Sequence, residues 1–247
     1  MNDAPHGFLG GRIVLRQGAG GHRAGTDAVL LAAAVEPAQT GLVVDAGAGA
    51  GAVGLMAAAR APRAVVRLVE IDPESAQLAR DNIALNGLEE RVEAIEADLL
   101  SYPARLSAGL ANETADVVLT NPPFLAAGRA RVSPDARRAL AHVAAAPLAE
   151  WTRACLSLLA PGGVFVMIHR ADALAECLAA VDGRLGALCV LPVLPRAGEA
   201  ATRLLLRGVK GSRAPLTLCA PLILHESDGA FMPAAAALHA GAAGLDW

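Results

Sequence analysis

The chain has 247 residues, a formal net charge of −3 and a hydrophobic content of 54%. This length and apolar content suit one α/β domain with a well-buried sheet. No apolar run reaches membrane-spanning length without interruption, and residues 1–6 lack the basic and apolar regions of a signal peptide, so we expect a cytoplasmic protein without a membrane anchor. The four cysteines have no paired spacing, which disfavours a metal or redox site and indicates buried thiols.

The N-terminal stretch, residues 1–40, is predicted to form an extension ahead of the main sheet. Residues 10–17 indicate a short β element, and the glycine-rich turn 18–21 follows it. A helix then begins at Thr26, with Thr26 or Asp27 as its N-cap. The extension either covers a bound cofactor as a lid or serves the fold alone.

A strand, a glycine-rich loop and a helix are predicted over residues 43–60. Gly47 and Gly49 have no side chains, so a ligand can lie directly on the backbone at the N-terminus of the helix. Asp45, at the end of the strand, can bind a cationic group. Taken alone, this loop suits any nucleotide-like ligand.

The next two predicted strands both end in an acidic residue. Strand 64–69 leads into Glu70, at the distance from the glycines that is typical of a carboxylate binding ribose hydroxyls. Strand 91–97 leads into Asp98 and Leu99. The Asp98 carboxylate can accept a hydrogen bond from an adenine amino group.

The motif Asn121-Pro122-Pro123-Phe124 follows the apolar strand 116–120 and carries the most information in the chain. The two prolines fix φ and remove two backbone donors. The side-chain carbonyl of Asn121 and the backbone carbonyl of Pro122 can therefore face outward as acceptors for an exocyclic amine. Phe124 is placed to stack on the planar ring that bears this amine. An isolated motif of this kind is more often an ordinary loop, so its meaning depends on a nearby methyl donor site.

The remaining elements alternate between helix and strand and end in a hairpin. They are helix 147–159, strand 163–169, helix 171–181 and strand candidates 188–194, 202–209 and 216–224, the last two forming an antiparallel hairpin. The predicted fold class is α/β, a Rossmann-like, doubly wound and mostly parallel sheet with an antiparallel C-terminal hairpin, in one domain over residues 1–247. Its core is assigned to residues 41–225, and the Ala-rich tail 226–247 is expected to form a terminal helix or to be poorly ordered.

In this order, the motifs resemble those of the class I S-adenosylmethionine-dependent methyltransferases that modify amines or amides. The segments that carry this resemblance are Val44 to Gly49, Glu70 to Pro73, Asp98 and Asn121 to Phe124. Residues 22–31, 137–142 and 162–170 further resemble the bacterial tRNA adenine-N6 methyltransferases that act beside the anticodon of a valine tRNA.

The resemblance implies S-adenosylmethionine as the cofactor. Its expected ligands are Gly47 and Gly49 beneath it, Glu70 at the ribose, Asp98 near the adenine and Thr26 near the methionine end. Asn121 and Pro122 would hold the target N6 of adenine. Because that nitrogen is a poor nucleophile, we expect positioning and electrostatic stabilisation of the transferred charge, without a covalent intermediate.

The slightly acidic net charge is unfavourable for binding RNA, but the basic residues are unevenly distributed. Four arginines follow the asparagine motif closely: Arg129, Arg131, Arg137 and Arg138. Their position indicates a loop that contacts RNA phosphates before the target base is inserted. The alternative is a solvated loop without a ligand.

The sequence therefore predicts an enzyme that methylates adenine N6 in RNA, with tRNA near the anticodon as the favoured substrate. Ribosomal RNA, DNA adenine, small amines and protein glutamine are alternatives with similar NH2 groups. Methyltransferases of protein glutamine commonly carry an extra N-terminal helical domain, for which this chain has no room. A noncatalytic cofactor-binding or RNA-binding module is a different class of function, disfavoured by intact polar ligands at every strand end.

Overall fold

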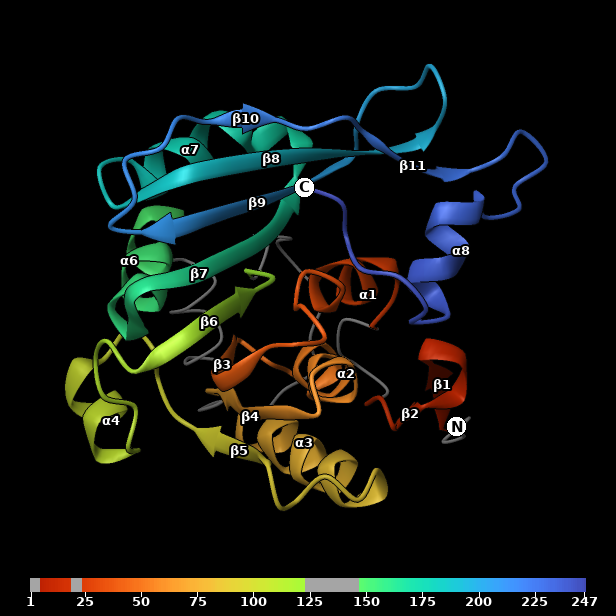
Figure 1. The fold of residues 1–247 in the computed structure, drawn as a ribbon. Helices are drawn as coiled ribbons and strands as arrows, with labels where there is room; N and C mark the ends of the chain where they lie inside the picture. Colours follow the sequence, from red (N-terminus) through yellow and green to blue (C-terminus); the bar gives the residue numbers. More distant parts are fainter. Residues whose placement is uncertain (1–4, 19–23, 123–146) are drawn as a thin grey trace.

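The computed structural model describes residues 5–18, 24–122 and 147–247. Within these residues, nine strands form one sheet, and two short strands form a separate antiparallel hairpin (Figure 1). Strands and helices alternate along most of the chain, as predicted for an α/β fold. No helix in the described ranges is long and apolar enough to cross a membrane.

The main sheet contains strands of two to twelve residues. They are β3 (Thr40–Ala46), β4 (Arg63–Glu70), β5 (Val92–Glu96), β6 (Ala115–Thr120), β7 (Leu159–Arg170), β8 (Leu185–Arg196), β9 (Arg203–Lys210), β10 (Thr217–Leu218) and β11 (Leu222–His225). Their spatial order is β10-β8-β9-β7-β6-β3-β4-β5, and β11 pairs with β8. The run from β5 to β7 is parallel throughout, so the carboxyl ends of its strands meet at one edge.

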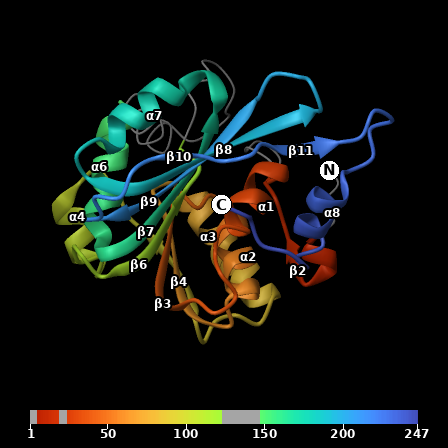
Figure 2. The same cartoon turned by 45° about the horizontal axis from the view of Figure 1, so that its top comes forward.

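Helices cover both faces of this sheet (Figures 1 and 2). The first face carries α1 (Thr26–Ala32), α2 (Ala52–Arg60) and α3 (Pro73–Leu85), and the second carries α4 (Tyr102–Ser107), α6 (Leu148–Leu158) and α7 (Leu174–Val181). Alternate strand residues supply the two cores, so that Val43 belongs to the first and its neighbour Val44 to the second. This double burial explains why the strands are almost continuously apolar.

The boundaries of α3 follow from local sequence signals. The Asp72 carboxylate accepts the backbone N–H of Ser75 at 3.0 Å and thereby caps the helix N-terminus. Pro73 occupies the first turn, and Asn86 is the C-cap ahead of Gly87, which has a φ of 62°. These local signals bound α3 at Pro73 and Leu85.

The predicted hairpin between residues 202–209 and 216–224 is wrong. β9 is hydrogen-bonded to β7 on one side and to β8 on the other, both antiparallel. Because both edges of β9 are occupied, the later segment joins the free edge of β8, where β10 and β11 pair in parallel. The antiparallel hairpin of the C-terminal half is instead formed by β8 and β9.

Three other element boundaries differ from the prediction. The N-cap of α1 is Gly25 and not Thr26 or Asp27, and the Asp27 carboxylate accepts a hydrogen bond from Arg203. β7 begins at Leu159, directly after α6, and includes the Pro-Gly-Gly segment that resembles a loop in the sequence. The predicted helix 171–181 is divided into a 3-10 turn, η2 (Ala171–Ala173), and α7.

The N-terminal extension is a small hairpin fastened to α3. It consists of β1 (His6–Phe8), the 3-10 turn η1 (Leu9–Gly11) and β2 (Ile13–Leu15), with Leu9 and Ile13 buried. The backbone of β2 is hydrogen-bonded to the side chain of Asn86, the C-cap of α3. These contacts hold the described hairpin against the end of α3.

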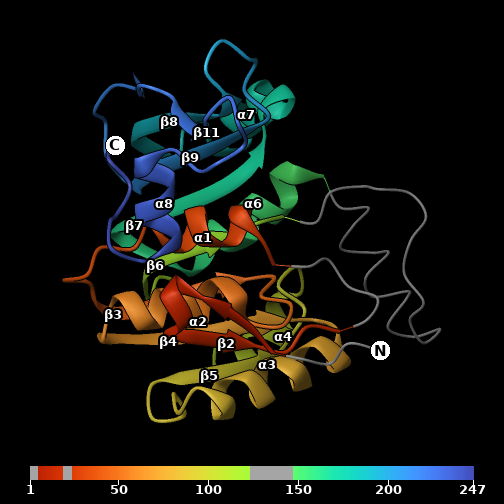
Figure 3. The same cartoon turned by 90° about the vertical axis from the view of Figure 1, so that its right-hand side faces the viewer.

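The C-terminal tail forms a helix, α8 (Pro233–His239), which lies beside α1 and η1 (Figure 3). Leu238 and Leu245 of this tail are buried in the first core. The guanidinium of Arg60 donates to the carbonyl of Ala243 at 2.7 Å, and the N–H of Leu245 donates to the carbonyl of Ala33 at 3.2 Å. The expected terminal helix is confirmed, and the residues after it pack against the first face of the sheet.

Candidate active site

The predicted donor and acceptor motifs meet at one edge of the sheet. Ala46 is paired with Val69 on one side and with Thr120 on the other, and these three residues lie at or next to the ends of β3, β4 and β6. The glycine loop, Glu70 and Asn121 follow them directly in the sequence. Ligands of open α/β sheets bind at this edge, so the fold supports the site that the motifs predict.

The glycine loop turns tightly from β3 into α2. The N–H groups of Gly47 and Ala48 donate to the carbonyl of Val69 at 2.9 and 3.0 Å, which holds the start of the loop against β4. Gly49 has a φ of 54°, which side chains rarely adopt. Among the described residues outside its chain neighbours, no heavy atom lies within 4 Å of the position that a Cβ of Gly49 would take. The backbone at Gly49 is therefore open to a ligand.

Asp45 is buried beneath the glycine loop, with 2% of its surface exposed. Its Oδ2 accepts the backbone N–H of Gly54 at 2.8 Å, which fastens the first turn of α2 to β3. Burial raises the pKa of Asp45 to about 7; the Gly54 N–H acts in the opposite direction, and the charge of Glu70 adds to the rise. The structure thus gives Asp45 a backbone partner, and its predicted contact with a cationic group stays a prediction.

Glu70 joins the end of β4 to the glycine loop. Its Oε1 accepts the N–H groups of Ile71 and Asp72, each at 2.9 Å, and its Oε2 accepts the N–H of Gly49 at 2.8 Å. Burial raises the pKa of Glu70, while these three N–H groups oppose the rise. Since a carboxylate oxygen can accept two hydrogen bonds, Oε2 keeps one acceptor position for a ligand hydroxyl.

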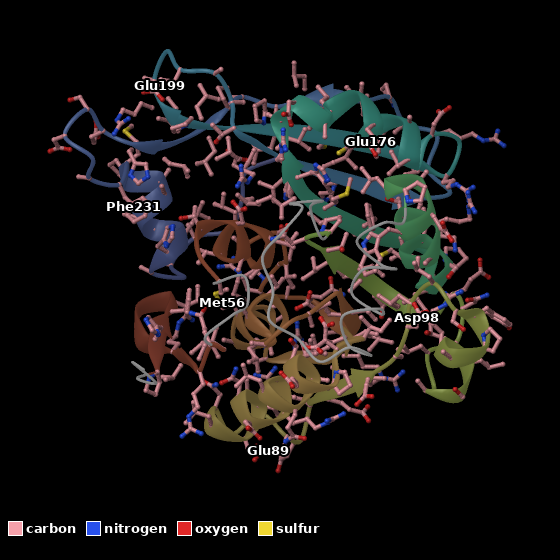
Figure 4. The ribbon with its side chains drawn as sticks, turned by 180° about the vertical axis from the view of Figure 1, so that it is seen from behind. Met56, Glu89, Asp98, Glu176, Glu199 and Phe231 are labelled. Atoms are coloured by element: carbon pink, nitrogen blue, oxygen red, sulfur yellow. The ribbon has the colours of Figure 1, made fainter. Side chains whose placement is uncertain are left out.

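A pocket of about 430 Å³ opens between the end of β5 and α4. Ile71 and Ala104 form apolar parts of its wall, and Asp98 contributes a carboxylate (Figure 4). One oxygen of Asp98 accepts the N–H of Leu100 at 2.9 Å. A mixed wall of this kind suits a flat ring with an amino group. Leu99 is buried in the second core, so its side chain does not line the pocket.

Asn121 places an unused acceptor next to the glycine loop. It follows Thr120, whose main chain pairs with Ala46 at the end of β3. The Oδ1 atom of Asn121 is buried and has no hydrogen-bond partner among the described residues. Pro122 is buried beside it. Buried polar atoms are almost always paired in folded proteins, so this carbonyl is available to a donor that the described residues do not supply.

Several predicted residues lie outside the described residues. They are Pro123 and Phe124 of the acceptor motif and the arginines Arg129, Arg131, Arg137 and Arg138. Their predicted roles in stacking and RNA binding stay predictions.

Thr26 lies at the first turn of α1 and is half-buried. The neighbouring Asp27 forms an ion pair with Arg203, in which Nε and Oδ2 are 2.9 Å apart. Arg203 is the first residue of β9 and pairs with Arg170, the last residue of β7. The ion pair therefore fixes the start of α1 at the carboxyl end of β7, two strands from β3.

The comparisons with known proteins agree with this geometry. The family described as "Methyltransferase small domain" matches residues 22–170. The chain belongs to this methyltransferase family. The methyltransferase is 32% identical over 213 residues to the tRNA1(Val) (adenine(37)-N6)-methyltransferase of Aeromonas hydrophila, covering 85% of each chain. The protein of the same name from Porphyromonas gingivalis is 31% identical over 228 residues, which cover 85% of this chain and 84% of that protein.

A solved structure gives the same assignment of fold. The crystal structure of a predicted O-methyltransferase from Agrobacterium tumefaciens matches with a TM-score of 0.75 and 36% identity, covering 89% of this chain and 98% of that chain. The α/β fold and the activity predicted from the motifs, S-adenosylmethionine-dependent methyl transfer, are confirmed.

The site fits S-adenosylmethionine, the cofactor of this methyltransferase. Gly49 offers open backbone, Glu70 keeps one acceptor position, and Asp98 lies in a pocket large enough for a ring. Across the described part of the chain, no group of three or more His, Cys, Asp or Glu side chains is arranged to hold a metal ion. Cys155 and Cys177 are buried, and burial raises the pKa of each thiol to about 12, which leaves them protonated and unreactive.

Sequence reasoning missed two buried polar residues that organise the site, Thr120 and Asn82. Thr120 is fully buried and is hydrogen-bonded to both Ala46 and Trp151. Asn82 on α3 is fully buried and donates to the carbonyl of Ala50 in the glycine loop at 2.9 Å. The sequence gives only a weak signal for Thr120, a polar residue at the end of an apolar strand. The hydrogen-bond partners of Thr120 and Asn82 are distant in the sequence, so they could not be predicted.

Proposed function

We propose that this methyltransferase transfers a methyl group to the exocyclic N6 of an adenine in tRNA, beside the anticodon. The observation that carries the proposal is the buried Oδ1 of Asn121, which has no partner among the described residues and lies next to the glycine loop. Leaving such an acceptor unpaired costs about 1 to 3 kcal/mol, so a donor from the substrate would complete the site. The names of the curated relatives, which specify N6 of adenine 37 in tRNA1(Val), support this substrate class.

The acceptor motif favours an amine over a hydroxyl as the methylated group. An NH2 group offers two donors, and Asn121 and Pro122 offer two carbonyl acceptors. A hydroxyl has only one proton and needs a base to remove it during the reaction. We therefore assign nitrogen as the target atom, although the Agrobacterium structure is described as that of an O-methyltransferase.

On the donor side, bound S-adenosylmethionine would supply an electrophilic methyl group. The residues that we assign to hold it are Gly47 and Gly49 beneath it, Glu70 at the ribose hydroxyls, Asp98 and the backbone of Leu99 at the adenine, and Thr26 and Asp45 toward the methionine end. Glu70 holds Gly49 through its own carboxylate, so ribose binding and the shape of the loop would be coupled.

On the acceptor side, the N6 lone pair of adenine is delocalised into the ring. It must become localised on the nitrogen before N6 can attack the methyl group. Hydrogen bonds from both N–H groups to Asn121 and Pro122 would favour a tetrahedral nitrogen and its developing positive charge. Pro123 would keep the loop rigid, and Phe124 would hold the ring plane by stacking. The proton would leave after the methyl group has been transferred.

A folded RNA can present its base to such a site only if the nucleotide is unstacked. We propose that Arg129, Arg131, Arg137 and Arg138 contact the phosphates next to that nucleotide. A tRNA substrate would place the enzyme in the cytoplasm.

The experiment that tests the function is incubation of the purified protein with S-adenosylmethionine and unmodified bulk tRNA, followed by mass spectrometry of the nucleosides. We expect N6-methyladenosine in tRNA and none in ribosomal RNA treated in parallel. Methylation of ribosomal RNA or of protein glutamine in place of tRNA would contradict the proposed substrate.

The role of Asn121 has its own prediction. Asn121→Ala should lower the rate of transfer by about 100-fold or more, because a preorganised contact to the developing charge is lost. The dissociation constant of S-adenosylmethionine should change by less than about twofold, since the assigned cofactor ligands are intact. Asn112→Ala, at an exposed position before β6, is the matched control. Full activity of Asn121→Ala would refute the mechanism.

A further inference from the structure

Thr120 is a buried hydroxyl at the junction of the donor and acceptor halves of the site. It is the last residue of β6, directly before Asn121, and 0% of its surface is exposed. Its Oγ1 donates to the carbonyl of Ala46 at 3.0 Å and accepts the indole N–H of Trp151 at 3.0 Å. Thr120 therefore connects the acceptor strand to β3, the strand that leads into the glycine loop.

Trp151 contacts both the acceptor strand and the glycine loop from the second face of the sheet. It belongs to α6, on the second face of the sheet, and is 5% exposed. Its indole N–H holds Thr120, while its ring packs against the start of the glycine loop. A Cβ on Gly47 would lie only 3.2 Å from Cζ2 of this ring, so the indole and the loop backbone are in close contact.

These contacts occur where strand pairing stops. Ala46 and Thr120 are the last paired residues of β3 and β6, and beyond them the chain forms the glycine loop and the Asn121 loop. The Thr120 hydroxyl and the Trp151 indole thus add a connection between the two strand ends at the point where the main-chain ladder ends. Such a connection matters for methyl transfer, because a misplacement of about 1 Å can slow a reaction about 100-fold.

We propose that Thr120 and Trp151 are positioning residues that set the distance between the donor methyl group and the acceptor amine. This inference rests on the function proposed above, because it takes Asn121 as the residue that binds the amine. Both side chains are buried beneath the site, so they act through Ala46, Gly47 and Asn121 and do not touch the ligands.

Three variants separate positioning from packing. Thr120→Val removes the hydroxyl but keeps the branched shape, Trp151→Phe keeps a ring without the N–H donor, and Thr120→Ser keeps the hydroxyl. The measurements are kcat and KM with tRNA, the dissociation constant of S-adenosylmethionine by calorimetry, and Tm. We expect the first two variants to lower kcat by about tenfold or more, with KM and the dissociation constant changed less than about twofold. Thr120→Ser should retain kcat within about threefold of the wild type.

Phe165→Leu is the control for loss of packing, because Phe165 is fully buried in the same core and lies on β7. It should lower Tm with little change in kcat. An equal fall of kcat in Phe165→Leu at an equal loss of Tm would overturn the positioning role, as would wild-type kcat in Thr120→Val. Wild-type activity on tRNA is measured first. If the wild type is inactive, the proposed substrate is overturned; if the wild type and Thr120→Val are equally active, only the positioning role is overturned.

Discussion

Glu70 and Asp45 show how single acidic residues of this site serve the backbone as well as a ligand. Glu70 accepts three backbone N–H groups, and Asp45 accepts the N–H of Gly54. Both side chains are buried, and burial raises the pKa of each carboxyl. Their position at strand ends was predictable from the sequence, whereas the contact of Glu70 with Gly49 depends on how the glycine loop lies against β4.

Asp45 leads to a prediction on pH. The pKa of the Asp45 carboxyl is raised from its usual value of 3.8 to about 7 in the folded protein. The folded protein therefore binds the carboxyl proton more tightly than the unfolded chain does. Protonation of Asp45 contributes its full stabilisation at a pH below the pKa of Asp45 in the unfolded chain. This stabilisation is lost as the pH rises through the pKa of Asp45 in the folded protein. We expect Asp45→Asn, which cannot ionise, to gain Tm relative to the wild type between about pH 5 and about pH 8.

Thermal denaturation of both proteins at the two pH values checks this expectation. Asp81→Asn is the control, because it makes the same substitution at an exposed position on α3. Parallel pH profiles for Asp45→Asn and the wild type would show that Asp45 does not ionise over this range.

At the scale of elements, α3 connects the N-terminal hairpin to the glycine loop. Asn82 accepts the N–H of Arg16 at 2.8 Å and donates to the carbonyls of Arg16 and Ala50 at 3.0 and 2.9 Å. One turn later, Asn86 accepts the N–H of Val14 and donates to its carbonyl, both at 2.8 Å. The two amides thus pair with the main chain of β2 and of Arg16 just after it, as a neighbouring strand would, but only Asn82 also reaches the glycine loop.

This difference makes Asn82 and Asn86 a matched pair for a test. Asn82→Leu and Asn86→Leu should both lower the free energy of unfolding, by about 2 to 5 kcal/mol, because the first leaves the backbone groups of Arg16 unpaired and the second those of Val14. Only Asn82→Leu should also weaken the binding of S-adenosylmethionine, by about tenfold, because it releases Ala50 as well. Chemical denaturation and calorimetry measure the two quantities. Equal cofactor affinity in both variants would mean that Asn82 does not shape the donor loop.

The C-terminal strands show where prediction of elements fails. Residues 216–224 have the apolar pattern of a strand, and strands do form there, as β10 and β11. Their partner was predicted wrongly because the sequence does not reveal that β9 is already paired on both sides. Pairing is decided by which sheet edge is free, and that is a property of the assembled sheet.

For the whole molecule, the proposed RNA substrate has to be reconciled with a net charge of −3. Phosphate contacts provide much of the affinity in protein–RNA complexes, and they require local positive charge. The proposed answer is the arginine group that follows Asn121, since it is close in sequence to the assigned chemistry. Near the site, Arg170 and Arg203 are each in an ion pair, with Asp172 and Asp27 respectively.

The double variant Arg129→Glu with Arg131→Glu tests this proposal. It should weaken tRNA binding by about tenfold or more and reduce the dependence of binding on salt, because fewer phosphates are neutralised. Arg153→Glu with Arg184→Glu makes the same change in net charge at exposed positions in a pocket beside Lys210 and is the control. Titration of labelled tRNA at several salt concentrations gives both quantities. If the two double variants bind alike, the effect is one of net charge and the loop has no specific role.

The sequence by itself determined the α/β class, the glycine loop, the acids that end β4 and β5, and the acceptor motif after β6. These features are local, because glycine, proline and strand-ending polar residues act through their own backbone and their immediate neighbours. Only the tertiary structure decided that Thr120, Trp151 and the glycine loop are joined, and that Asn82 holds Ala50. Thr120 and Ala46 are 74 residues apart in the chain, and such contacts depend on strand order and on helix packing across the whole domain.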